Sequence, residues 1–225
     1  MVKKTTELPG KPGIYEETLK LKNTTTLRYT LSVPESFSPQ QPVPLVIALH
    51  YGGTVTPWYG KEYLSILVEP ALRELGAVMA APDCAANGWD NPSNVSAILE
   101  MLDHIKKNYN IADKQILITG FSLGGIGTWY MAARHPHIFS AAIPISSIAK
   151  TEDLDKIKDI PLYVIHSNQD EIFSIKPVQE MVQKLETRGA AIHLEIVAGI
   201  SHYDTGMFVE PLRTAIPWLK KIWAI

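Results

Sequence analysis

The stretch "ITGFSLGGIGTWYMAARHP", residues 118–136, joins an apolar, β-branched run to a segment with helical spacing. A strand that becomes a helix within a few residues needs a sharp turn. Gly120 and Gly124 flank Ser122 in this turn, and glycine relieves crowding there because it has no Cβ. The stretch therefore predicts a strand, a tight turn with a serine at its tip, and a helix.

Further apolar runs of strand length recur along the chain. Two leading strands, about Tyr15–Lys22 and Leu27–Val33, are joined by the short turn "NTTT" and predict one antiparallel edge. The later runs end in glycine or polar residues, as expected of strands that are covered on both faces. These runs are "VPLVIALH", "GAVMAAP", "KQILITG", "SAAIPIS", "IPLYVIH" and "AIHLEIV".

Helical periods lie between the apolar runs. Apolar residues at three-and-four spacing predict helices over Ser93–Tyr109 and around Val178–Leu185. A closing helix runs from Met207 to Leu219, where Pro217 must kink or delimit it. The gap 146–160 predicts only a short polar helix, too short for a lid. Strands that alternate with helices indicate a mostly parallel sheet with an open site at its carboxyl edge.

Composition restricts the kind of protein. With 225 residues, 46% hydrophobic and 20% charged, the chain can bury a full core, and we expect one domain over residues 1–225. The net charge is -2, and the sequence has no cluster of basic residues that would bind nucleic acid or an anionic membrane surface. We therefore expect a small-molecule partner. The first ten residues lack the apolar run of a secretory signal, which favours a cytoplasmic location.

Cys84, the single cysteine, excludes an internal disulfide and a cysteine-built metal site. We expect it to be a bystander thiol, and we expect no metal and no organic cofactor. The sequence carries no indication of the oligomeric state.

The serine at the turn fits G-x-S-x-G, the nucleophile elbow, which projects a reactive hydroxyl above a sheet. The alternative is that Ser122 only caps the following helix. A serine nucleophile needs a base, and the base needs a third group to orient it. In elbow enzymes these partners follow in the order acid, then histidine. Only His202 follows the acid position and lies in a loop after the last strand, so it is the predicted base.

Asp170, four residues after His166 at the end of a strand, is the predicted acid. Glu171 and Asp204 are the rival carboxylates. Asp204 is too near His202 in sequence to orient it easily from another strand end.

Two backbone N–H groups must stabilise the negative oxygen of an acyl-transfer intermediate. Leu123, the residue after the serine, supplies one. The loop "HYGG" supplies the other, where we favour Gly52 and keep Tyr51 and Gly53 as alternatives. His50 is expected to hold this loop in place.

With these residues assembled, the chain resembles the α/β-hydrolase superfamily. In particular, it is similar to small esterases of the carboxylesterase/phospholipase, polyhydroxybutyrate-depolymerase and feruloyl-esterase groups. The resemblance covers residues 27–225 and rests on "PVPLVIALHYGG", "YNIADKQILITGFSLGG", "VIHSNQDEIF" and "GISHYD". It implies an α/β-hydrolase fold: a mostly parallel sheet of about eight strands, flanked by helices, without a lid domain. It also implies a triad of Ser122, Asp170 and His202.

Two positions depart from the family pattern. Tyr51 follows the histidine where a glycine is usual, and Ser167 replaces the glycine of the usual "HG" before the acid. Neither change touches the triad.

Aromatic and apolar residues near the strand ends are candidates for the substrate pocket: Tyr51, Trp58, Trp89 and Met207. Trp89 either stacks on a ring of the substrate or fills the edge of the core. The expected function is hydrolysis of small carboxylic esters, with short acyl or aryl groups, through an acyl-enzyme. The alternatives are an acyl-thioesterase, a peptidase of the prolyl-oligopeptidase type, and a non-catalytic binding protein of the same fold.

Overall fold

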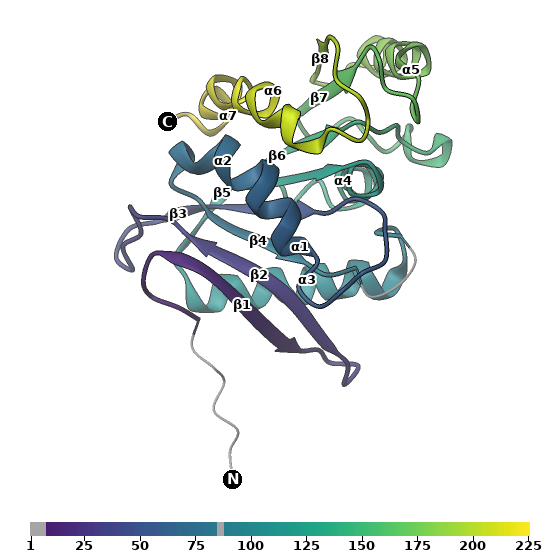
Figure 1. The fold of residues 1–225 in the computed structure, drawn as a ribbon. Helices are drawn as coiled ribbons and strands as arrows, with labels where there is room; N and C mark the ends of the chain where they lie inside the picture. The colour runs from purple at the N-terminus through teal and green to yellow at the C-terminus, as the bar shows by residue number, and fades with distance from the viewer. Residues whose placement is uncertain (1–7, 85–87) are drawn as a thin grey trace.

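The computed structural model describes residues 8–84 and 88–225, and its centre is a single sheet of eight strands (Figure 1). The strand order is β1-β2-β4-β3-β5-β6-β7-β8. The β1–β2 and β2–β4 pairs are antiparallel and the others are parallel, so the predicted mostly parallel sheet with one antiparallel edge is confirmed. The strands are β1 Gly13–Lys20, β2 Thr26–Val33, β3 Val43–Leu49, β4 Val78–Pro82, β5 Ile111–Phe121, β6 Ala141–Ile145, β7 Leu162–Ser167 and β8 Ile192–Val197.

Helices cover both faces of the sheet (Figure 1). Alternate residues of β3 belong to different apolar clusters: Leu45 and Ile47 share one with buried residues of α3, α4 and α5, whereas Val46 shares the other with buried residues of α1, α2, α6 and α7. The central strands are therefore buried on both sides, which explains their continuous apolar sequences. The helices are α1 Gly60–Tyr63, α2 Glu69–Leu72, α3 Pro92–Asn108, α4 Leu123–Arg134, α5 Ile175–Thr187, α6 Val209–Arg213 and α7 Ile216–Trp223.

Helix α3 matches the predicted helix 93–109 within one residue at each end. The Asn91 side chain accepts a hydrogen bond from the Ser93 N–H, and Pro92 occupies the first turn, where its missing N–H costs nothing. The sequence predicted this helix well because its periodicity and its cap agree.

The helical segment over residues 60–75 was not predicted. It combines α1, a π-type turn at Leu64–Val68, α2 and a 3₁₀ turn at Arg73–Leu75. The periodic signal was present, because the buried residues Tyr63, Leu67 and Ala71 recur at four-residue intervals. Pro70 and the changes of helix type break the segment into pieces too short to stand out.

The C-terminal helix is also divided. A 3₁₀ turn at Thr205–Phe208 precedes α6 and α7, and Pro217 lies in the first turn of α7. Pro217 therefore delimits a helix and does not kink one.

The connection between β6 and β7 contains a 3₁₀ turn at Thr151–Asp153, where a short polar helix was expected. Arg134 of α4 forms an ion pair with Asp153, which is buried and ties this connection to the body of the molecule. Leu154 and Ile157 also point into the core. Within the described ranges, the structure contains no helix with the length and apolar character of a membrane span.

Candidate active site

Ser122 occupies the tip of the turn between β5 and α4 with φ 55° and ψ -115°, a backbone conformation that residues other than glycine rarely adopt. A Cβ atom on Gly120 would collide with the backbone of Gly124, and one on Gly124 would collide with the carbonyl of Leu49. The two glycines are therefore required by the close approach of the backbone. This turn exposes the Ser122 side chain to a pocket at the carboxyl edge of the sheet.

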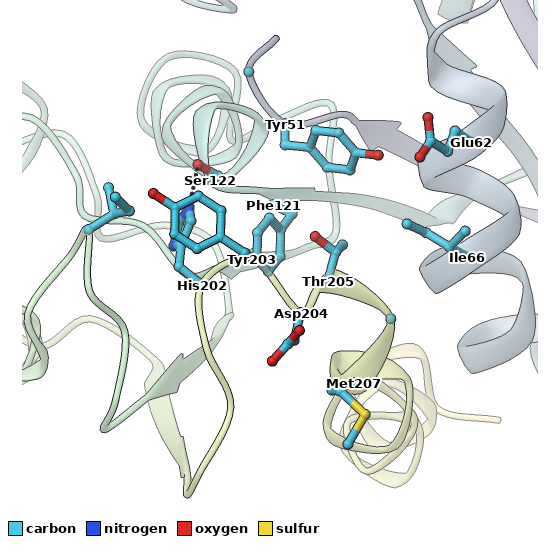
Figure 2. A pocket seen from close by; sticks show the side chains of 13 residues that line it. Tyr51, Glu62, Ile66, Phe121, Ser122, His202, Tyr203, Asp204, Thr205 and Met207 are labelled. Carbon is cyan, nitrogen blue, oxygen red and sulfur yellow. Dashed lines mark hydrogen bonds between the residues drawn. The ribbon is translucent and has the colours of Figure 1, made fainter.

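His202 lies in the loop after β8, and its ring joins the serine to a carboxylate. His202 Nε2 is 2.9 Å from Ser122 Oγ (Figure 2). On the other side of the ring, His202 Nδ1 is 2.8 Å from Asp170 Oδ2. An ionised carboxylate only accepts hydrogen bonds, so Nδ1 carries the proton of the neutral ring and Nε2 has the free lone pair. The imidazole is thus oriented to take the proton of the serine hydroxyl.

Asp170 is the carboxylate that contacts the ring. Its second oxygen, Oδ1, accepts the backbone N–H groups of Ile172 at 2.9 Å and Phe173 at 2.7 Å. Burial by itself raises the pKa of the Asp170 carboxyl, but the bonds from His202 and from these two N–H groups outweigh it, and the pKa lies below its ordinary value. Asp170 is therefore held as an anion beside the imidazole.

The two rival carboxylates lie elsewhere. Glu171 Oε2 accepts the backbone N–H of His202 at 2.8 Å and does not hydrogen-bond to its ring. This bond lowers the pKa of the exposed Glu171 carboxyl. Asp204 lies on the wall of the pocket. Neither orients the imidazole.

His166, at the end of β7, contacts the loop that carries Asp170, and the sequence did not predict this contact. Its Nε2–H donates to the carbonyl of Phe173 at 2.6 Å, and the N–H of that same residue binds Asp170. Burial lowers the pKa of His166 and favours the neutral ring. The "VIHS" sequence shows only that a histidine ends a strand. The hydrogen bonds that connect His166 to Asp170 through Phe173 form only when the loop is folded, so the sequence alone does not predict them.

His50 fastens the loop that carries Tyr51 and Gly52. Its Nδ1–H donates to the Tyr51 carbonyl at 2.7 Å, and its Nε2 accepts the Cys84 N–H at 3.1 Å. Burial lowers the pKa of His50, which suits a neutral ring with one donor and one acceptor. The structure thus places His50 where the sequence expected it to hold the loop.

Gly52 faces the start of α4. A Cβ on Gly52 would lie 3.8 Å from Leu123 Cβ, so the backbone of the loop and that of the elbow approach each other at the pocket. Leu123 is the first residue of α4, and the first N–H groups of a helix have no partner within it. The predicted oxyanion-hole donors Leu123 and Gly52 are thereby brought to one place.

The pocket beside Ser122 has a volume of about 780 Å³ and is formed mainly by the loop of Tyr51 and Gly52, the helical segment 60–75 and the loop that follows His202 (Figure 2). Two of the four predicted pocket residues, Tyr51 and Met207, line it. Two further lining residues, Glu62 and Ile66, lie on the segment 60–75, which was not predicted. The lining residues are Tyr51, Gly52, Glu62, Ile66, Phe121, Ser122, Ile172, His202, Tyr203, Asp204, Thr205, Gly206 and Met207.

Trp89 and Trp58 do not line this pocket, and the prediction that they do is wrong. Trp89 is 1% exposed, packs against α4 at Gly127, and donates its indole N–H to the His50 carbonyl at 2.9 Å. It therefore fills the core edge. The Trp58 indole N–H instead points to the Glu17 carbonyl of β1, at 3.3 Å. Residues 85–87 of the loop expected to line the cleft lie outside the described part of the chain.

This fold, with a serine, a histidine and a carboxylate in hydrogen-bond contact at the carboxyl edge of the sheet, is that of a carboxylic ester hydrolase of the α/β-hydrolase superfamily. The model of the dienelactone hydrolase family matches residues 80–207, more than half of the chain. The chain belongs to the dienelactone hydrolase family.

The chain is also similar to individual proteins. Protein usf of Aquifex pyrophilus is 26% identical over 181 residues, which are 71% of this chain and 75% of the relative. Feruloyl esterase B of Neurospora crassa is 26% identical over 136 residues, which are 56% of this chain and 46% of that enzyme. The crystal structure of a thermostable esterase superimposes with a TM-score of 0.78 at 25% identity and covers 92% of this chain and 62% of the esterase chain.

Proposed function

We propose that Ser122, His202 and Asp170 are the catalytic triad of a serine esterase that cleaves small carboxylic esters. The single observation that carries this proposal is the continuous hydrogen-bonded line from Ser122 Oγ through the His202 ring to Asp170 Oδ2, with 2.9 and 2.8 Å steps. The strained turn at Ser122 and the membership of the dienelactone hydrolase family support it.

In the acylation step, Ser122 Oγ attacks the ester carbonyl carbon while His202 Nε2 takes the hydroxyl proton. The carbonyl oxygen becomes an oxyanion, which the N–H groups of Leu123 and Gly52 stabilise. The intermediate collapses when His202 gives the proton to the leaving alkoxide, which departs as an alcohol. Water then attacks the acyl-enzyme by the same proton route and releases the acid and free Ser122. Asp170 holds the imidazole and stabilises its cation in both steps.

The pocket favours small acyl or aryl groups. Exposed apolar side chains form much of its wall and rim: Ile66, Ile172, Tyr203 and Met207. A volume of about 780 Å³ suits a ligand of small-molecule size. The short connection between β6 and β7 provides no apolar lid of the kind that a long-chain lipid substrate would need.

An acyl-thioesterase or a peptidase of the prolyl-oligopeptidase type would use the same triad, and a binding protein would use none of it. The esterase relatives favour oxygen esters over these alternatives. We also propose that residues 1–225 form one α/β-hydrolase domain, since all eight strands join one sheet. A cytoplasmic location stays a prediction from the sequence.

The test is hydrolysis of an aryl ester, p-nitrophenyl butyrate, by the wild type and by Ser122→Ala. The exposed Ser96 on α3 offers a matched control, Ser96→Ala. We expect the Ser122 variant to lose covalent labelling by a fluorophosphonate and at least about 10³-fold in kcat, while the control keeps both. Turnover retained by a folded Ser122→Ala protein would reject Ser122 as the nucleophile.

A further inference from the structure

The charged groups of the pocket have one sign. Glu62 and Asp204 line it, and both are acidic side chains. No lysine or arginine occurs among the described residues that line it. The chain as a whole has a net charge of only -2, so this local excess of negative charge is a property of the pocket.

Glu62 faces into the pocket from α1. The Tyr51 hydroxyl points toward its carboxylate, and Tyr51 belongs to the loop that carries the proposed oxyanion donor (Figure 2). Burial, followed by the charge of Glu62 and its hydrogen bond, raises the pKa of Tyr51 to about 12. The Tyr51 phenol therefore remains a neutral hydrogen-bond donor and holds the Glu62 carboxylate at the pocket wall.

The cationic side chains nearest in sequence are committed to other partners. Lys61, next to Glu62, forms an ion pair with Glu16 at 2.8 Å. Arg213, on the helix after the Asp204 loop, pairs with Glu210 and donates to the carbonyl of Pro70 at 2.8 Å. The ion pairs of the described residues include none between Glu62 or Asp204 and a lysine or an arginine.

We propose that Glu62 and Asp204 make the pocket select esters by charge, so that neutral and cationic esters are cleaved and esters carrying a carboxylate are rejected. This inference rests on the proposed esterase function. The pocket is about 9 Å across, taken as the cube root of its volume. At that distance and an effective dielectric constant of about 40, Coulomb's law gives about a fivefold change in binding per carboxylate. Two carboxylates together predict about tenfold or more at low salt.

The experiment compares three p-nitrophenyl esters with similar acyl chains: butyrate, the glutarate monoester with a free carboxylate, and 4-(trimethylammonio)butyrate. Each kcat/KM is corrected for spontaneous hydrolysis and divided by the rate constant of that ester with imidazole, a neutral nucleophile, so that differences in intrinsic reactivity are removed without a charge bias. At about 10 mM ionic strength we expect the order cationic, neutral, anionic, with about tenfold between neutral and anionic. At about 0.5 M salt the difference shrinks to threefold or less, because the Debye length falls below the pocket width.

The double variant Glu62→Gln with Asp204→Asn is expected to abolish this order, since glutamine still accepts the Tyr51 hydroxyl but has no charge. Glu180→Gln, an exposed residue on α5 outside the pocket lining, removes one charge elsewhere and is expected to preserve it. Equal cleavage of all three esters by the wild type, or an unchanged order in the double variant, overturns the inference while the proposed esterase stands. Failure to cleave any of them overturns both.

Discussion

The acid of the proposed triad makes a sharp prediction possible. Asp170 Oδ1 accepts two backbone N–H groups, from Ile172 and Phe173, and Oδ2 accepts the Nδ1–H of His202. In Asp170→Asn the amide oxygen is expected to take the place of Oδ1, because two fixed donors point at it. The amide NH₂ group then faces His202 Nδ1 and forces this nitrogen to accept.

The imidazole proton in this variant moves to Nε2, where it donates to Ser122 Oγ and cannot receive its proton. We therefore expect kcat to fall about 10⁴-fold, as for the equivalent change in other Ser-His-Asp triads. This is about 5.5 kcal/mol of transition-state stabilisation, at about 1.4 kcal/mol for each factor of ten. Both backbone N–H groups keep their acceptor, so the variant is expected to fold.

The assay is hydrolysis of p-nitrophenyl butyrate at pH 7 to 8, with thermal unfolding measured on the same samples. Glu171→Gln is the matched variant, because Glu171 is the adjacent carboxylate. The amide oxygen of the introduced glutamine can still accept the His202 backbone N–H. Its loss is expected to stay below about tenfold. A folded Asp170→Asn protein that keeps more than a tenth of wild-type activity would refute the reasoning, as would an equal loss in Glu171→Gln.

Three further predictions concern stability and the pocket. The lowered pKa of Asp170 contributes stability above its ordinary pKa of 3.8, and this contribution is lost as the pH falls through the folded-state value. The difference in free energy of unfolding between the wild type and Asp170→Asn is therefore expected to shrink below about pH 4 in urea titrations, and a constant difference would contradict it. Gly124→Ala is expected to cost more than about 3 kcal/mol or to prevent folding, because its Cβ meets the Leu49 carbonyl; wild-type denaturant stability would disprove this close approach. Met207→Ala is expected to raise KM for butyrate esters severalfold and to change the free energy of unfolding by no more than about 0.5 kcal/mol, because Met207 lines the pocket and is 64% exposed. Trp89→Phe is expected to lower the free energy of unfolding by about 1–3 kcal/mol with little change in KM, because Trp89 is buried and donates to the His50 carbonyl. The reverse pattern would place Trp89 at the pocket.

The sequence predicted the secondary structure best where local signals agreed. The apolar runs became strands, and α3 appeared where periodicity and the Asn91 cap coincided. It failed at residues 60–75, where Pro70 and a π-type turn interrupt an amphipathic pattern. The helical signal in a sequence adds up over consecutive residues, so a short helical piece gives only a weak signal. Such a piece is stabilised by tertiary packing, which the local sequence does not show.

The sequence by itself determined the serine turn and the order of serine, acid and histidine. The serine turn depends on spacing within a few residues. The order of the three side chains rests on the chain order known for elbow enzymes and on the rule that parallel strands end at one edge of the sheet. The tertiary structure alone decided the walls of the pocket. Trp89 is buried because Gly127, far along the chain, leaves room for it. Glu62 and Asp204 face one pocket because two segments separated by about 140 residues meet there. Such contacts depend on packing between elements, which local sequence patterns do not encode.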